Sequence, residues 1–375
     1  MSATNPQKID REFENIMRLA GDLATKREAW ESRPTAIEFS FNNLCNLKCQ
    51  MCAKADDEPN VLMNKSAGNR ALEQLLPHTL HWMPSANSEP LLNDMTALIE
   101  LCRKHITWLL LFTNATLLTR ERFLQIRERT HRIFISFDSH VKATFELIRT
   151  GARYDEVVRN IKDILPIAKE DGTEITFNVV LMKPNLPQLP DYVNWVADVG
   201  GEIIHVQELL PNSTHFHHLL IDAPDQEIAE ILARTRANAR ARQVDLYLDL
   251  RPPFQSEDVH HHREWSKAPL ATMRERFNYA IRALYPGFCH MAAYYFKVNP
   301  NGDVFPCCRA PDELNMGNIN RNTVEEIWNG PQYREFRRNM FTGNYAKSCS
   351  NCYVLVGNPH YQQMIKASGS QPTTV

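Results

Sequence analysis

Long apolar runs are missing from this chain of 375 residues. A membrane-spanning helix needs about 18 or more consecutive apolar residues, and no run in the sequence reaches that length. Residues 1–27 also lack the apolar centre of a secretory signal. An excess of charge of one sign is missing too. The formal net charge is -2, which gives no reason to expect nucleic acid or an anionic membrane as a partner. We therefore expect a cytoplasmic protein with no membrane and no nucleic-acid partner.

Cysteine, in contrast, occurs nine times. In a cytoplasmic protein, clustered cysteines are more often metal ligands than disulfides. Cys102 stands alone on a predicted helix, and we interpret it as a buried structural thiol. The others form two groups, the first with Cys45, Cys49 and Cys52, the second with Cys289, Cys307, Cys308, Cys349 and Cys352.

The first group follows a predicted strand. Residues 36–41 alternate apolar and polar side chains, which is typical of a strand, and they lead directly into the loop with three thiols. A structural zinc site requires a fourth nearby ligand. A cubane iron–sulfur cluster, in contrast, can be held by three thiolates with its fourth iron open. We therefore predict that Cys45, Cys49 and Cys52 hold such a cluster. The alternatives are a zinc knuckle or three unrelated core thiols.

Helical and strand-like stretches alternate after this loop. Each of six predicted strands is followed by a stretch with apolar residues at helical spacing, which predicts a parallel sheet with right-handed crossovers. Six units are too few for a closed eightfold barrel. The predicted strands cover residues 36–41, 79–83, 107–113, 132–138, 174–182 and 202–208, and the helices cover 67–76, 91–104, 120–129, 155–169, 186–199 and 225–241.

The spacing of the first three cysteines, with Met51 before the last one, resembles the cluster loop of radical S-adenosylmethionine (SAM) enzymes. This resemblance implies an α/β fold with a partial (β/α)6 TIM-like barrel. It also implies that the open iron binds the methionine part of SAM.

The resemblance further implies SAM-binding residues where the strands end. Ser88 and Glu89 stand where the family usually carries Gly-Gly-Glu-Pro, but both glycines are absent here. Polar residues after a strand, such as those at 113–114 and 136–138, are more often part of a turn or a helix cap than ligands. The arginine of this set, Arg149, is of a residue type that is usually exposed. The residues expected at the cofactor are Ser88, Glu89, Asn114, Ser136, Asp138, Arg149, Asn178 and Gln207.

The second cysteine group lies around a predicted hairpin. Residues 292–298 and 304–307 are strand-like and are joined by a turn at 299–303, and Thr323 to Glu326 form a capping box that starts a helix. Cys289, Cys307, Cys349 and Cys352 thus supply four thiolates. By themselves these fit zinc and a fully ligated iron–sulfur cluster equally well.

The spacing Cys-x12-Gly-x4-Cys, Met316 to Ile319 and the final Cys-x2-Cys resemble the C-terminal SPASM/twitch extension of radical SAM enzymes. No cysteine follows Cys352, so the chain resembles the shorter twitch form, as in the 2-deoxy-scyllo-inosamine dehydrogenase type. The resemblance implies one auxiliary 4Fe–4S cluster in a small domain made of a β-hairpin and a helix.

We expect five parts along the chain. Residues 1–33 form an N-terminal helix and linker, 34–241 the partial barrel, 242–288 a bridging segment, 289–356 the auxiliary-cluster domain and 357–375 a flexible tail. The bridge contains a strand-like stretch at 244–249 and the run His260 to His262, which we interpret as solvated because a metal site needs spaced histidines held by a second shell.

The expected chemistry is hydrogen-atom abstraction by a 5′-deoxyadenosyl radical, with an external donor such as flavodoxin or ferredoxin supplying the electron. We expect a hydroxylated small molecule, a sugar or aminocyclitol, that is oxidised or epimerised. The preference over a peptide rests on the short N-terminal part, which cannot form a leader-binding domain. Cys308 directly follows a proposed ligand and points to the opposite face of its strand. It is therefore a candidate hydrogen donor for epimerisation, or else a structural thiol.

Two other functions remain open. One is a radical SAM enzyme that modifies a ribosomally made peptide and obtains leader recognition from a separate chain. The other is a non-catalytic zinc-binding interaction protein, which accounts for the second cysteine group but not for three thiols at the end of a strand.

Overall fold

The computed structural model describes residues 6–52, 59–85, 88–209, 216–250, 254, 258–259, 268–350, 352–356 and 358–367. Within these residues, ten strands form one open sheet in the order β10-β9-β8-β1-β2-β3-β4-β5-β6-β7. Strands β8 and β1 to β7 pair in parallel, and β8, β9 and β10 pair antiparallel. The strands are β1 (Ala36–Phe39), β2 (His81–Met83), β3 (Trp108–Thr113), β4 (Thr130–Ser136), β5 (Glu174–Leu181), β6 (Ile203–Glu208), β7 (Asp245–Asp249), β8 (Tyr295–Val298), β9 (Asp303–Phe305) and β10 (Gly317–Asn318).

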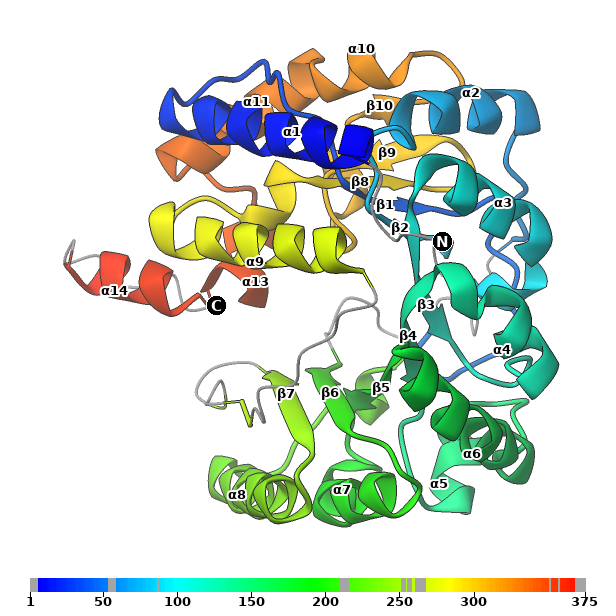
Figure 1. The fold of residues 1–375 in the computed structure, drawn as a ribbon. Helices are drawn as coiled ribbons and strands as arrows, with labels where there is room; N and C mark the ends of the chain where they lie inside the picture. Colours follow the sequence, from blue (N-terminus) through cyan, green and yellow to red (C-terminus); the bar gives the residue numbers. More distant parts are fainter. Residues whose placement is uncertain are drawn as a thin grey trace.

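The sheet curves into an arc, and the crossover helices cover its outer side (Figure 1). These helices are α2 (Lys65–Leu75), α3 (Met95–His105), α4 (Arg120–Ile126), α5 (Lys142–Ile148), α6 (Tyr154–Asp171), α7 (Leu189–Asp198) and α8 (Asp225–Arg242). Short 3-10 turns lie at Pro90–Leu92, Arg127–Arg129, Leu186–Gln188, His217–Leu219, His290–Ala293 and Asp312–Leu314. The predicted partial barrel is confirmed, with a C-terminal domain added to its first strand.

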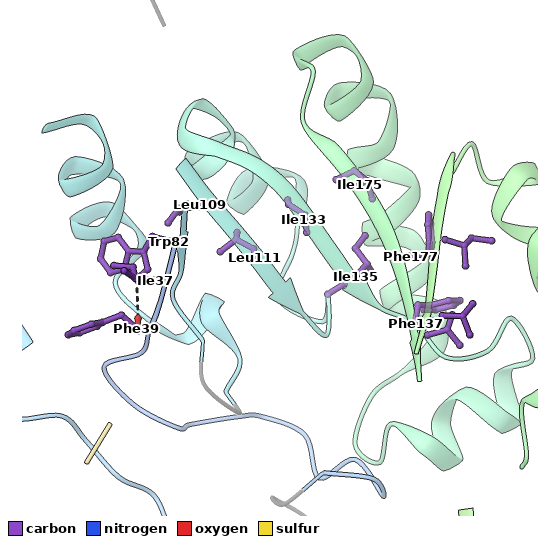
Figure 2. Packing of buried hydrophobic residues seen from close by; sticks show 14 of the residues in the cluster. Ile37, Phe39, Trp82, Leu109, Leu111, Ile133, Ile135, Phe137, Ile175 and Phe177 are labelled. Atoms are coloured by element: carbon purple, nitrogen blue, oxygen red, sulfur yellow. Dashed lines mark hydrogen bonds between the residues drawn. The ribbon is translucent and has the colours of Figure 1, made fainter. Parts of the chain in front are cut away.

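The core lies between the sheet and these outer helices. Alternate residues of each strand point to the same face, and Figure 2 shows the large apolar side chains that gather there, from Ile37 and Phe39 on β1 to Phe177 on β5. The indole Nε1 of Trp82 donates a hydrogen bond to the carbonyl of Phe39 at 3.0 Å, so this buried polar atom is satisfied. The residues between the core residues point to the inner face of the arc, which carries polar side chains together with a small apolar cluster of Ala36, Met83, Leu110 and Tyr295.

Three elements differ from the sequence expectations. Residues 245–249, expected within a bridge, form β7 and pair with β6, so the parallel sheet gains a strand. The helix expected from residue 91 begins at Met95, because Asp94 accepts hydrogen bonds from the backbone N–H groups of Thr96 and Ala97 and caps it there. Helix α5 was not predicted, since its seven residues are too few to show a clear helical period.

The C-terminal part follows the predicted pattern at its start. The hairpin of β8 and β9 is confirmed, with Gly302 at φ +91° in its turn, as is the Thr323 capping box. Helix α14 occupies part of the segment that we expected to be flexible, and the Asn358 side chain before it donates to the carbonyl of Arg282 on α9 at 2.9 Å. The helices here are α9 (Pro269–Leu284), α10 (Val324–Trp328), α11 (Pro331–Thr342), α12 (Lys347–Ser350), α13 (Tyr353–Val356) and α14 (Pro359–Ala367).

The N-terminal helix α1 (Pro6–Ala24) packs against α9. Glu12 and Arg274 form a buried ion pair between them, with Oε1 and Nη1 at 2.8 Å. His260 to His262 and residues 368–375 lie outside the described residues. None of the helices that the structure describes is long and apolar enough to cross a membrane.

Candidate functional site

The loop with Cys45, Cys49 and Cys52 lies beyond the carboxyl end of β1. It is held against the end of α5 by two backbone hydrogen bonds, from Lys48 N to the carbonyl of Thr150 and from Gln50 N to the carbonyl of Ile148, each at 3.0 Å. Gly151 has φ +98°, and a Cβ there would come within 3.4 Å of Leu47. A side chain would therefore have ordinary van der Waals contacts here, and it is the positive φ that favours glycine at this position.

Nitrogen donors surround two of the three sulfurs. The sulfur of Cys45 accepts from the backbone N–H of Leu47 at 3.5 Å and from Asn114 Nδ2 at 3.8 Å, and that of Cys49 accepts from Arg149 Nη1 at 3.7 Å. Burial raises the pKa of both thiols. Donors to sulfur and a nearby positive charge favour the thiolates that a metal or cluster requires.

Three of the residues predicted at the cofactor meet at this loop. Asp138 and Arg149 form a buried ion pair through Oδ2 and Nε, and Asp138 Oδ1 also accepts from the backbone N–H of Val180 at 2.8 Å. Although burial opposes it, the Asp138 carboxylate raises the pKa of Arg149. Asn114 donates to Asn46 of the loop at 2.9 Å.

Glu89 is placed beside the same loop but has protein partners. Its carboxylate accepts from Thr113 Oγ1 at 2.7 Å, from Asn114 N at 2.8 Å and from Leu91 N at 3.2 Å. Burial raises its pKa. Ser88 lies with its Oγ 3.3 Å from that of Ser40. Glu89 therefore joins the ends of β2 and β3, a role that the sequence did not reveal.

Ser136, Asn178 and Gln207 lie farther along the inner face, on β4, β5 and β6. Ser136 is opposite Asn178 in the register of the sheet. The buried Asn178 Oδ1 has no hydrogen-bond partner among the described residues, so a donor group of a ligand fits there. Sequence reasoning missed His205, whose Nε2 lies 2.8 Å from Asp249 Oδ2 and whose Nδ1 lies 3.4 Å from Gln207. The alternation of polar residues in 203–208 was the available signal.

The second thiol set gathers at the hairpin. Burial raises the pKa of Cys289 to about 12, with added effects from Cys352 and Cys349, and burial raises that of Cys307, with added effects from Cys308 and Cys289. These effects involve Cys308 as well as Cys289, Cys307, Cys349 and Cys352, so all five thiols lie in one region of the C-terminal part. Cys308 is exposed, and its carbonyl accepts from Lys297 Nζ at 3.4 Å.

Among the residues that the structure describes, one group of three His, Cys, Asp or Glu ligand atoms lies within 4.8 Å, and it consists of His81, His131 and Glu275. This group belongs to the opposite edge of the sheet, where the strands begin. Arg132 Nη2 lies 3.6 Å from Glu275 Oε2 and donates to Glu174 at 3.0 Å. A guanidinium so close competes with any cation for the carboxylate. These residues therefore form a polar contact between α9 and the sheet, at the end of the strands opposite to the first thiol set.

Comparison with known proteins adds to this geometry. The family model of SPASM, an iron-sulfur cluster-binding domain, matches residues 289–353. The PqqA peptide cyclase of Bradyrhizobium diazoefficiens is 22% identical over 335 residues, which cover 85% of this chain and 78% of that protein. The probable GTP 3′,8-cyclase of Sulfurisphaera tokodaii is 23% identical over 192 residues, and the match spans 49% of this chain and 60% of that protein.

Solved structures with a similar fold are also found. SuiB from Streptococcus suis, in its complex with S-adenosylmethionine, has a TM-score of 0.62 and 16% identity over 90% of this chain and 74% of that one. Residues 289–353 thus match the SPASM domain, and these similarities support the resemblance of the chain to radical SAM enzymes that carry this domain. The expectation of 4Fe–4S clusters and SAM as cofactors is thereby confirmed for the family, and the tie between zinc and iron–sulfur at the second thiol set is resolved in favour of iron–sulfur.

Proposed function

We propose that this radical SAM protein is an enzyme that modifies a ribosomally made peptide. The observation that carries the proposal is the pairing of β1 with both β2 and β8. Through it, the strand that leads into the first cysteine loop is also the neighbour of the hairpin that leads to Cys307. The two thiol sets are thus joined through neighbouring strands of one sheet.

Similar proteins support a peptide substrate. The relative that matches most of this chain is a peptide cyclase, and SuiB has also been solved bound to its precursor peptide SuiA, with 94% of this chain covered. The comparisons do not support the sugar or aminocyclitol that we expected, and the peptide alternative fits them better. The argument from the short N-terminal part carries no weight against it, because a separate chain can supply leader recognition.

Each thiol set has a role in this proposal. Cys45, Cys49 and Cys52 hold the SAM-binding cluster, and Cys289, Cys307, Cys349 and Cys352 hold one auxiliary cluster. When bound, the first cluster would pass an electron from an external donor to SAM, which would supply the chemistry that abstracts a hydrogen atom from a substrate carbon, and the auxiliary cluster would accept an electron. Asn114, Asp138 and Arg149 surround the first loop, whereas Ser136, Asn178 and Gln207 line the face along which SAM and substrate bind.

The hydrogen abstraction has two possible outcomes. If the auxiliary site takes an electron from the substrate, the outcome is oxidation. If Cys308 instead returns a hydrogen atom to the substrate, the outcome is epimerisation. On β1, Glu38 Oε2 accepts from the Tyr295 hydroxyl at 2.7 Å and Oε1 is 3.4 Å from Lys297 Nζ, and both partners stabilise its buried carboxylate.

Anaerobic reconstitution tests the proposal. The protein is expected to bind iron and sulfide and to cleave SAM when reduced by dithionite, flavodoxin or ferredoxin. Peptides encoded beside its gene are then incubated with it and examined by mass spectrometry, with sugars and aminocyclitols in parallel. A peptide that loses hydrogen or gains a cross-link supports the proposal. Oxidation of a cyclitol with every peptide unchanged restores the small-molecule function, and zinc without iron excludes the radical chemistry.

A further inference from the structure

We propose that the buried pair of Arg149 and Asp138 sets the reduction potential of the first cluster through the sulfur of Cys49. The proposal rests on the function above, in that Cys49 is a cluster ligand. It assigns to Arg149 a role toward the cluster itself, in addition to the contact with SAM expected from the sequence. Arg149 does not touch the iron itself and acts on it through the sulfur of Cys49.

The backbone fixes this contact from both sides. Ile148 and Thr150, the neighbours of Arg149, accept hydrogen bonds from Gln50 and Lys48, the neighbours of Cys49. The two residues are therefore held opposite each other by a pair of bonds of 3.0 Å each. Across this pair, Arg149 Nη1 donates to Cys49 Sγ at 3.7 Å.

The contact is also buried. Arg149 has 9% of its surface exposed, Asp138 2% and Cys49 6%. Asp138 accepts from Arg149 Nε with Oδ2 and from Val180 N with Oδ1, so the carboxylate orients the guanidinium and is itself fixed by β5. Water screens charges less at such a site than at the surface, so each charge acts on the sulfur more strongly than an exposed charge would.

The sign of each effect follows from charge. Reduction adds a negative charge to a cluster, and a positive group or an N–H donor at a ligand sulfur stabilises that charge and raises the potential. Arg149 supplies both. Asp138 carries the opposite charge in the same pocket and lowers the potential. Removing the two charges singly must therefore shift the potential in opposite directions.

The test is a potentiometric titration of the anaerobic protein without SAM, followed by electron paramagnetic resonance. The signal that disappears when Cys45, Cys49 and Cys52 are replaced identifies the first cluster. Arg149→Gln is expected to lower its midpoint potential, Asp138→Asn to raise it, and the double variant to return near the wild-type value. Arg149→Lys keeps the charge but shortens the donor, and its potential should fall between those of the wild type and Arg149→Gln.

A matched control is available in the same chain. Arg274 is also buried and pairs with Glu12 at 2.8 Å, but on α9 and α1. Arg274→Gln should lower thermal stability and leave the potential unchanged. The proposal is overturned if Arg149→Gln and Asp138→Asn shift the potential in the same direction, or if neither shifts it while iron content stays at the wild-type level. If Arg149→Gln loses its iron, the midpoint potentials of Arg149→Lys and Asp138→Asn decide, since the first should fall below and the second rise above the wild-type value. Absence of iron from the wild type contradicts the proposed function instead.

Discussion

The side-chain amide of Asn329 holds the backbone of Trp30 by two hydrogen bonds. Oδ1 accepts from Trp30 N at 2.7 Å, and Nδ2 donates to the carbonyl of Trp30 at 2.9 Å. The Trp30 ring lies 4.3 Å from the guanidinium of Arg337, and the same guanidinium lies 4.4 Å from the ring of Trp328. The segment before the sheet and the SPASM domain thus form one packed unit.

Replacing Asn329 by leucine should destabilise this unit. Two backbone groups of Trp30 lose their partners, and each such buried group costs about 1 to 3 kcal/mol. The thermal unfolding midpoint, measured anaerobically, should fall by several degrees. Asn322→Ala in the same domain is the control, because that residue is exposed. An equal change in both variants would show that the contact with Trp30 contributes nothing specific.

Iron content should divide between the two thiol sets. The reconstituted protein is expected to hold about eight irons, four for each cubane. Replacing Cys45, Cys49 and Cys52 together should halve the iron and abolish SAM cleavage, because the open iron is lost with its ligands. Replacing Cys349 should also halve the iron but leave some SAM cleavage. If the Cys349 variant keeps all of its iron, the assignment of the auxiliary ligands is wrong.

Glu89 offers a choice between structure and SAM binding. Glu89→Ala leaves Thr113 Oγ1 and the N–H groups of Asn114 and Leu91 without their acceptor, and we expect a loss of stability of about 2 to 4 kcal/mol. If its carboxylate also binds the amino group of SAM, affinity for SAM should fall by about 10-fold to 100-fold, the size of a charge-assisted hydrogen bond. Thr113→Val is the control, since it removes one of these bonds and keeps the carboxylate. An unchanged SAM dissociation constant in Glu89→Ala assigns the residue to structure alone.

Cys308 decides between epimerisation and oxidation. A thiol exchanges its hydrogen with solvent, so in deuterated water an epimerised product should carry one deuterium at the inverted carbon. Cys308→Ala should then keep both clusters and hydrogen abstraction while the inverted product disappears. Cys102→Ala is the matched control, because that thiol is fully buried on α3. A product without solvent deuterium, formed equally well by Cys308→Ala, assigns the chemistry to oxidation.

His78 should make stability depend on pH. Burial and then the positive charges of Arg33 and Lys8 lower its pKa from 6.5 to about 4. Between these values the unfolded chain binds a proton that the folded protein does not, so stability is lost as pH falls from 6.5 toward 4. His78→Gln should reduce this loss, as seen in thermal midpoints across the range. The exposed His218 provides the control, and a His78→Gln profile parallel to the wild type would contradict the prediction.

The sequence by itself determined those features that depend on neighbouring residues. The alternation in residues 36–41, the three thiols after it, the turn at Gly302 and the capping box of Thr323 each act over a few positions, so their physical cause is contained in the local chain. They suffice for a parallel sheet with crossover helices, for the hairpin and for the two thiol sets. The same local character explains the errors: α5 is too short to show a period, and the start of α3 depends on the cap at Asp94.

Only the tertiary structure decided which residues, distant in the sequence, contact each other. Cys49 and Arg149 are 100 residues apart and Trp30 and Asn329 are 299 apart, and no local pattern specifies such pairs. They meet because strand order and helix packing bring their backbones together. The hydrogen-bond donors of Glu89 could not be predicted from the sequence either. Its place in the sequence indicates a ligand contact, but the donors that surround it come from the end of β3 and the turn at Leu91. Which groups satisfy a buried charge is fixed only when the whole sheet has formed, because burial itself creates the need for a partner.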